Sequence, residues 1–246
     1  MSWRVIPFRK YDPYFKTGLN RALMESLREN PRPVVFLAGW DQDTVNVGYS
    51  QQVEEQVDTE EVEERDIAVV RRQGGGGTTY LRSDGEITWG IVAPESFYPD
   101  DLDEVYRRVC GRIASGLEEI GIGAEHEPVN DVVTGNGKIS GATAKKERGV
   151  IYIGGTLLYD VDPEEMFQVL TPGEEKIEDK EIRDFRERVT SVRKESDASF
   201  EEAVEAVRKG LLDGREYEED RLTDQERSRA EELAEKYRTD EWIYQE

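Results

Sequence analysis

The sequence contains one cysteine, Cys110, and one histidine, His126, in 246 residues. A single cysteine excludes an internal disulfide and a CxxC metal site, and it is typical of a cytosolic protein. The first residues, MSWRVIPFRKY, lack the apolar core of a signal peptide. No apolar run approaches the about 20 residues that a membrane helix needs. We therefore predict a soluble, cytoplasmic protein.

Positive charge is also scarce. There are 33 Lys and Arg residues against 55 Asp and Glu residues, and the formal net charge is -22. Such a field repels phosphate backbones and excludes a general nucleic-acid-binding role. Recurrent apolar runs such as VVFLAGW nevertheless predict a folded core rather than a disordered acidic chain. Arg outnumbers Lys and the acid is spread along the chain, a pattern that favours a halophilic source, where salt screens the charge.

Hydrophobic periodicity predicts an α+β fold with a mixed, mostly antiparallel sheet flanked by helices. We expect a single domain over residues 1–246, in which residues 196–246 form C-terminal surface helices packed on the sheet. The main predicted helices cover residues 12–30, 101–121, 199–214 and 223–242, with a short helix after the Asp162-Pro163 cap. The predicted strands cover residues 34–40, 44–50, 67–73 and 86–94, followed by a three-stranded meander within residues 130–162.

The first segment that carries chemistry is RRQGGGGTTY, residues 71–80, in which four glycines follow a predicted strand. Glycine lets a backbone approach a ligand closely and point N–H groups at an anion. Arg71 and Arg72 add fixed positive charge, so the segment is compatible with an anion site. It matches neither GxxxxGK[ST] nor GxGxxG. The alternative is a glycine-rich turn whose arginines balance nearby acids.

The second segment is NDVVTGNGKISGATA, residues 130–144, in which Lys138 is an isolated cation. A lysine is a mobile point charge that suits a phosphate or a developing negative charge. Taken alone, Lys138 would be read as a surface lysine after the Asn136-Gly137 hairpin turn.

These two segments, in this order and followed by GGTLLYDVD, resemble the lipoate–protein ligase family within the biotin/lipoate ligase superfamily. The stretch MFQVLTPGEEKIEDKEIRDFRERVTSV also looks like the family's segment after the meander. The resemblance covers residues 14–246 and implies the catalytic domain only, without the accessory C-terminal domain that several members carry. We expect that the chain needs a separate small partner protein for full activity.

The resemblance implies a lipoate–protein ligase that uses ATP and Mg²⁺ to activate lipoate as lipoyl-AMP and then transfers it to a lysine of a lipoyl carrier domain. The implied carriers are the acyltransferase subunits of 2-oxoacid dehydrogenases and the glycine-cleavage carrier protein. Carried over by motif, Lys138 would hold the acyl carbonyl and the phosphate, and Arg72 would contact the nucleotide phosphates. The other implied site residues are Gly75, Gly76 and Gly77 along the acyl tunnel; Gly77, Thr78, Thr79 and Tyr80 beside the nucleotide; Asn130 and Asp131, which orient the lysine or, for Asp131, bind magnesium; and Ser140, Gly141 and Thr156 at the substrate.

Two positions depart from the family's pattern, because Leu81 and Gly154 stand where the family usually or often has histidine. His126 is interpreted as a loop residue. Related octanoyltransferases use a cysteine nucleophile and no ATP, which makes Cys110 the alternative catalytic group, although its position in the middle of a predicted helix favours a small buried side chain. The alternatives are therefore an ATP-independent octanoyl or lipoyl transferase, or a non-catalytic binder of lipoate or its adenylate. The downstream segment disfavours a biotin ligase.

Overall fold

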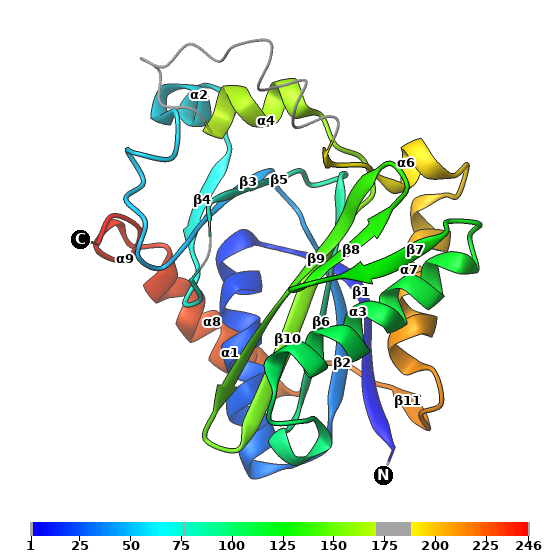
Figure 1. The fold of residues 1–246 in the computed structure, drawn as a ribbon. Helices are drawn as coiled ribbons and strands as arrows, with labels where there is room; N and C mark the ends of the chain where they lie inside the picture. Colours follow the sequence, from blue (N-terminus) through cyan, green and yellow to red (C-terminus); the bar gives the residue numbers. More distant parts are fainter. Residues whose placement is uncertain (1, 76, 171–187, 246) are drawn as a thin grey trace.

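The computed structural model describes residues 2–75, 77–170 and 188–245, and Figure 1 shows its course. The strands are β1 (Trp3–Tyr11), β2 (Val34–Trp40), β3 (Thr44–Val47), β4 (Ala68–Arg71), β5 (Thr79–Leu81), β6 (Glu86–Pro94), β7 (Ala124–Glu127), β8 (Asp131–Thr134), β9 (Gly137–Glu147), β10 (Val150–Leu158) and β11 (Tyr217–Glu219). The helices are α1 (Pro13–Glu29), α2 (Thr59–Glu64), α3 (Leu102–Glu118), α4 (Pro163–Leu170), α6 (Val192–Glu195), α7 (Phe200–Leu212), α8 (Asp224–Tyr237) and α9 (Asp240–Ile243).

A large sheet in the order β11-β1-β2-β6-β10-β9-β8-β7 forms the centre of the molecule. Strand β1 pairs in parallel with β2 and β11, whereas the other neighbours pair antiparallel. The mixed, mostly antiparallel sheet predicted from the sequence is therefore confirmed. Helix α1 covers one face of this sheet, called the α1 face below, and α3 covers the other (Figure 1).

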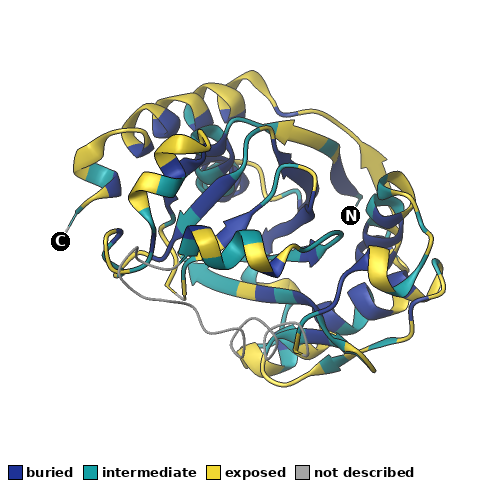
Figure 2. Cartoon of the chain, turned by 90° about the horizontal axis from the view of Figure 1, so that it is seen from above, coloured by how far each residue is buried: buried dark blue, intermediate teal, exposed yellow. Residues whose placement is uncertain are grey.

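The C-terminal helices form a second layer outside the first. Helix α7 packs mainly on α3, and α8 packs on α1. The expectation that both helices pack directly on the sheet therefore needs correction for α8, which packs mainly on α1. Figure 2 shows buried residues in the sheet and on the inward sides of these helices, with exposed residues on their outward sides, as amphipathic helices require.

Local signals in the sequence set the helix ends. The Asp12 side chain accepts hydrogen bonds from the backbone N–H groups of Tyr14 and Phe15, and Pro13 occupies the first turn of α1. Helices α7 and α8 both begin with a capping box, Ser199 with Glu202 and Thr223 with Glu226. Each box pairs donors at the helix start that would otherwise lack partners.

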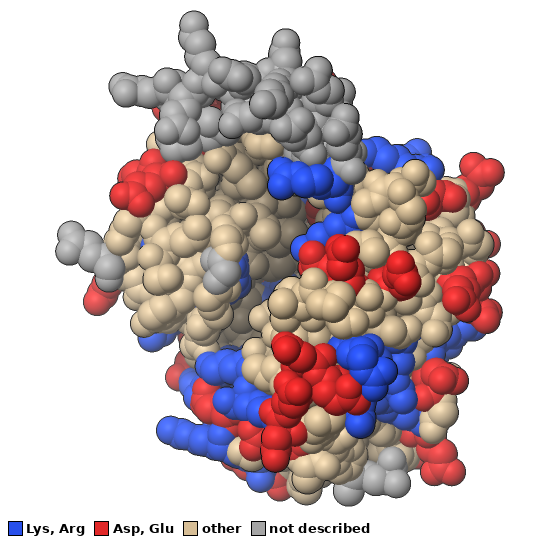
Figure 3. Space-filling view, viewed as in Figure 1, with Lys and Arg blue, Asp and Glu red and all other residues tan. Residues whose placement is uncertain are grey.

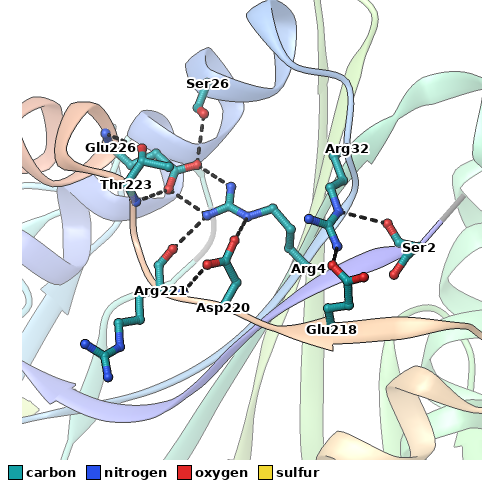
Figure 4. Close-up of polar contacts among 9 residues, drawn as sticks. All are labelled: Ser2, Arg4, Ser26, Arg32, Glu218, Asp220, Arg221, Thr223 and Glu226. Atoms are coloured by element: carbon teal, nitrogen blue, oxygen red, sulfur yellow. Dashed lines mark hydrogen bonds and ion pairs between the residues drawn. The ribbon is translucent and has the colours of Figure 1, made fainter.

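A buried ion pair joins the N-terminal strand to α8. The Arg4 guanidinium on β1 contacts Glu226 at 2.7 Å and Asp220 at 2.9 Å, and Ser26 of α1 donates to the same Glu226 carboxylate at 2.9 Å (Figure 4). The Arg4 guanidinium holds the pKa of Glu226 below its ordinary value, against the opposing effect of burial. This network ties β1, α1 and α8 together.

A small sheet in the order β4-β3-β5 stands beside the large one. Its core contains Val45, Val47 and Tyr80, to which α4 adds Val169 and α9 adds Ile243. Strand β5 was not expected from the sequence, and the strand predicted over residues 67–73 ends at Arg71. The four glycines, residues 74–77, lie in the chain between β4 and β5 of this sheet, and this segment is called the glycine loop below.

Candidate functional site

One row of small residues crosses the α1 face. The pairing register places Asp131 opposite Gly141, Gly141 opposite Thr156, Thr156 opposite Thr88, and Thr88 opposite Ala38. Side chains that pair across neighbouring strands point to the same face of a sheet. These five positions therefore form a row of small and polar side chains from β8 to β2 on the α1 face, and this row is called the trough below.

Lys138 reaches this trough because of an irregularity in β9. The register shifts between Val132 and Val133, so one extra residue lies in β9 between Lys138 and Ser140. The Lys138 ammonium contacts the Asp131 carboxylate at 2.7 Å. A Cβ built on Gly141 would lie 3.0 Å from that ammonium. Three of the predicted site residues, Asp131, Lys138 and Gly141, are thus brought together at one end of the trough.

The segment that precedes α6 holds the start of β9. The backbone N–H of Thr190 donates to the Lys138 carbonyl at 2.9 Å. Gly137 has a φ of +125°, and a Cβ built on it would lie 2.7 Å from the Arg188 carbonyl oxygen. Glu195 accepts hydrogen bonds from Thr190 at 2.6 Å and from Asn136 at 3.1 Å. The end of the downstream segment noted in the sequence therefore positions Lys138; its residues 171–187 lie outside the described residues.

Asn130 fixes the strand next to Lys138. Its amide donates to the Ala142 carbonyl, and its own carbonyl accepts from the Ala142 N–H at 2.9 Å. The Cys110 thiol of α3 donates to the same Asn130 carbonyl over 3.6 Å. Cys110 is 0 % exposed, and burial, with the Asp131 carboxylate adding to it, raises the pKa of the thiol to about 12. This cysteine is therefore a neutral, buried thiol near the ion pair.

Several predicted residues place their backbone, rather than their side chain, toward the site. The Ser140 side chain is 1 % exposed and lies on the face opposite the trough, in register with Val132 and Leu157 of that core. The Tyr80 ring lies in the small-sheet core, where its hydroxyl donates to Asp43 at 3.2 Å. Burial and the Asp43 carboxylate raise the pKa of Tyr80. Only the main chain of Ser140 and Tyr80 can border a ligand in this arrangement.

The two arginines before the glycine loop bind backbone carbonyls. The buried Arg71 guanidinium donates to the carbonyls of Gly48, Tyr49, Gln51 and Ile243 at 2.6 to 3.1 Å. The expectation that both arginines flank an anion site is therefore wrong for Arg71, which joins a loop to α9. Arg72 donates to the carbonyls of Gly75, Gly77 and Asn46 at 2.7 to 3.2 Å. Its phosphate contact stays a prediction.

The described glycines of the loop have free space around them, and the predicted site residue Gly76 lies outside the described residues. A Cβ built on Gly74, Gly75 or Gly77 meets no atom within 4 Å. Thr78 donates to the Gln51 side chain at 2.9 Å, whereas the Thr79 side chain is exposed. The loop lies between β4 and β5 of the small sheet, whereas Lys138 belongs to β9 of the large sheet. Figure 3 shows a hollow in the surface between these two parts of the molecule. The glycines therefore leave room for a ligand on the small-sheet side of the hollow.

At Leu81 and Gly154, where the family usually or often has histidine, the neighbouring side chains explain the residue that is present. Leu81 packs against Trp40 and Val70. A Cβ on Gly154 would lie 2.1 Å from the Tyr152 hydroxyl, so Tyr152 occupies the space that a larger residue at 154 would need. His126 lies in β7 rather than in a loop, with its Nε2 3.1 Å from the Val129 carbonyl. No histidine side chain takes part in the trough among the described residues.

A separate cavity of about 640 Å³ opens between α1, α8 and the β9–β10 turn. Two of its lining cations pair with a lining carboxylate, Arg21 with Glu25 at 2.6 Å and Arg229 with Glu25 at 2.8 Å. Lys138 and Asp131 are not among its lining residues. We therefore place the candidate site at the trough and not in this cavity.

Comparison with known proteins identifies the family. The model of the lipoyl protein ligase A/B catalytic domain matches residues 12–212. The chain belongs to this family. It is 31% identical to the octanoyltransferase LipM of Kyrpidia tusciae over 99% of the chain and 98% of that protein, and 27% identical to LipM of Staphylococcus aureus over the same shares.

Solved structures of the family share the fold. The chain resembles the bipartite lipoate protein ligase of Thermoplasma acidophilum, solved in a study with its E2 lipoyl domain, with a TM-score of 0.89, 26% identity and coverage of 99% of this chain and 96% of that one. It also resembles a lipoate-protein ligase A bound with ATP, with a TM-score of 0.84, 25% identity and 99% coverage of both chains. The resemblance to this family expected from the sequence is confirmed.

Membership of this family identifies the chain as an enzyme of lipoyl or octanoyl transfer. Between the two activities expected from the sequence, the names of the curated relatives favour the octanoyltransferase over the ATP-dependent ligase. Within the described residues, no helix is long and apolar enough to cross a membrane. The halophilic source finds no support in the relatives and stays a prediction from composition.

Sequence reasoning missed several residues of the site. It did not single out Lys16, Trp40 or Thr88, all of which lie on the α1 face or above it. Lys16 had a detectable signal, because it stands three residues before Leu19 on the apolar stripe of α1, where a charged residue is unusual. Thr88 had none, since a threonine in a strand is ordinary.

Proposed function

We propose that this enzyme transfers a lipoyl or octanoyl group to a lysine of a lipoyl carrier domain through an acyl-adenylate made from ATP. The observation that carries the ATP-dependent route is the state of the only thiol in the sequence. A thioester route requires a thiolate that the acyl donor can reach. Cys110 is 0 % exposed, with a pKa raised to about 12. At neutral pH such a thiol is protonated and inaccessible.

The trough supplies charge stabilisation for an adenylate route. The Lys138 ammonium, held by Asp131 at 2.7 Å, is 41% exposed and can face the acyl carboxylate and the phosphate that are joined. A fixed cation at a site where negative charge develops lowers the barrier without the need for a nucleophile on the enzyme. Thr156 and Gly141 give the substrate a floor of small residues, and the open glycines leave room for the nucleotide.

Arg72 takes part in this proposal as a phosphate ligand. It would exchange its contacts with the carbonyls of Gly75 and Gly77 for phosphate oxygens, which are stronger acceptors because they are charged. Nucleotide binding would thereby release the contacts through which Arg72 holds the glycine loop.

A magnesium ion fits the site only with help from the nucleotide. The described residues contain no group of three or more His, Cys, Asp or Glu side chains that could hold a metal. Mg²⁺ commonly binds through one or two carboxylates together with substrate phosphates. Asp131 would supply the carboxylate, and the ion would neutralise charge on the phosphates.

The second candidate is octanoyl transfer without ATP, which the names of the LipM relatives favour. A non-catalytic binder is the third outcome. One experiment separates all three: a lipoyl carrier domain is incubated with the chain and with lipoate plus ATP, with synthetic lipoyl-AMP, or with an octanoyl-carrier protein, and its mass is measured. The lipoyl-AMP arm tests transfer even where activation needs the separate small partner.

The adenylate route predicts a lipoyl mass increase in the lipoyl-AMP arm. With the small partner added, it predicts the same increase in the lipoate plus ATP arm and a pyrophosphate exchange into ATP that depends on lipoate. A mass increase in the octanoyl-carrier arm alone assigns the chain to the second candidate and overturns our proposal. No mass increase in any arm assigns it to the third.

A further inference from the structure

A lysine ammonium is buried above the end of the trough at β2. Lys16 of α1 is 3 % exposed, and its ammonium lies 5.0 Å from the centre of the Trp40 ring and 5.9 Å from that of Phe36. Within residues 2–75, 77–170 and 188–245, this ammonium makes no hydrogen bond or ion pair. A buried charge without a partner is costly, and contact with two aromatic rings offsets only part of the cost.

Two buried polar atoms on the same face lack hydrogen-bond partners in the described structure. They are the indole N–H of Trp40 and the hydroxyl of Thr88. Phe36, Ala38 and Trp40 alternate along β2, so all three point to the α1 face, and Thr88 pairs with Ala38. Unsatisfied buried polar groups are rare in folded proteins, and several together call for a ligand or another explanation.

The trough connects this cluster to Lys138. From Gly141 to Ala38 the row crosses three strand spacings, or roughly 14 Å at about 4.8 Å per spacing. That span accommodates an extended lipoyl or octanoyl chain when the carboxyl group is held at Lys138. The far end of the acyl chain would then lie beside Lys16, Trp40 and Phe36.

We infer that Lys16 and Trp40 form the far end of the acyl pocket and select an acyl group that ends in a sulfur-containing ring over one that ends in a methyl group. The inference rests on the proposed function for the position of the carboxyl group. Sulfur is a polarisable, weak hydrogen-bond acceptor and makes favourable contacts with aromatic rings. The dithiolane ring of lipoate thus gives the ammonium and the indole N–H an acceptor that octanoate lacks.

Selectivity follows from the unpaired donors. A pocket that hydrogen-bonds one substrate rejects an analogue that lacks the partner, because the buried polar groups are left without one. Because sulfur is a weak acceptor, we expect a moderate preference of about tenfold for lipoate over octanoate, equivalent to about 1.4 kcal/mol.

The test measures the dissociation constants of free lipoate and free octanoate by calorimetry, for the full chain and for three variants. Lys16→Met keeps the length of the side chain and removes the charge, and Trp40→Phe removes the indole N–H. Lys209→Met, at an exposed position on α7, is the matched control. Circular dichroism verifies that each variant is folded.

We expect the full chain and Lys209→Met to prefer lipoate about tenfold, Lys16→Met to lose most of this preference, and Trp40→Phe to lose part of it. An unchanged preference in Lys16→Met, or equal or absent binding of the two acids by the full chain, overturns the inference. Selective binding that depends on Lys16, without any acyl transfer to a carrier domain, would keep the inference and refute the proposed function.

Discussion

Replacing Lys16 by methionine should stabilise the protein at neutral pH. Burial lowers the pKa of Lys16 from its ordinary 10.5 to about 8. Each pKa unit corresponds to about 1.4 kcal/mol, so the charged ammonium costs the folded state about 3 kcal/mol at pH 7. The variant also loses the contacts with Trp40 and Phe36, worth about 1 kcal/mol. The expected net gain in the free energy of unfolding is about 2 kcal/mol.

The gain should depend on pH in a defined direction. The folded-state pKa is lowered, so the unfolded chain binds the Lys16 proton more tightly than the folded chain does. The penalty is complete below pH 8, and it is relieved as the pH rises from about 8 toward 10.5. The difference in stability between Lys16→Met and the unaltered chain should therefore shrink over this interval.

Urea unfolding at pH 7 and pH 10, with identical salt for both proteins, measures this difference. In thermal unfolding at pH 7, about 2 kcal/mol should raise the Tm by about 4 to 8 °C for a chain of this size. An equal or lower stability of Lys16→Met at pH 7 would refute the reasoning, because it would mean that the ammonium is not desolvated or has an anionic partner. If Lys16→Met stabilises the protein and also loses substrate selectivity, then Lys16 lowers the stability of the fold in exchange for function.

Three further predictions follow from the site and the surface. Lys138→Met should lower the rate of transfer from lipoyl-AMP by about 10²- to 10³-fold, the usual loss for a group that stabilises developing charge. Its Tm should stay within a few degrees of that of the unaltered chain. An unchanged rate of transfer would remove Lys138 from the mechanism. Gly155→Ala should destabilise the fold by about 1 to 3 kcal/mol in urea unfolding, because its Cβ would lie 2.4 Å from the Gly141 carbonyl and the Trp89 ring, whereas Gly75→Ala, with open space around it, should leave stability unchanged. When KCl is raised from about 0.1 M to about 1 M, the Tm should rise. The reason is that the Debye length falls from about 10 Å to 3 Å, which screens the self-repulsion of a chain with net charge -22. A fall of the Tm with added KCl argues against the halophilic interpretation.

Much of the architecture follows from local sequence signals. The helices predicted over residues 12–30 and 199–214 correspond to α1 and α7, which Asp12 and Ser199 cap at their starts. Strands β1 and β11 were missed because their residues alternate poorly: β11 is exposed throughout, and the second half of β1 carries polar residues. These strands exist because β11 pairs with β1, and β1 with β2, a non-local contact that no single segment encodes.

In the candidate site, too, local motifs predict some features, and contacts between distant segments determine the others. The GKISG motif identified Lys138, but the bulge in β9 that turns its side chain to the α1 face depends on pairing with β8. Arg71 and Arg72 look equivalent in the sequence, yet Arg71 is the last residue of β4 and Arg72 the first after it, and their side chains bind different carbonyls. The role of Arg71 depends on Ile243, a residue far along the chain, and could not be predicted from the motif.

The most direct test of the central claim is the mass of a carrier domain incubated with lipoate and ATP and either the unaltered chain or Cys110→Ser, each with and without the small partner. We predict that the carrier lysine gains a lipoyl group only when ATP is present, and that Cys110→Ser transfers it within about twofold of the unaltered rate, since serine can keep the hydrogen bond to the Asn130 carbonyl. Acyl transfer that proceeds without ATP from an octanoyl carrier and disappears in Cys110→Ser would contradict the account.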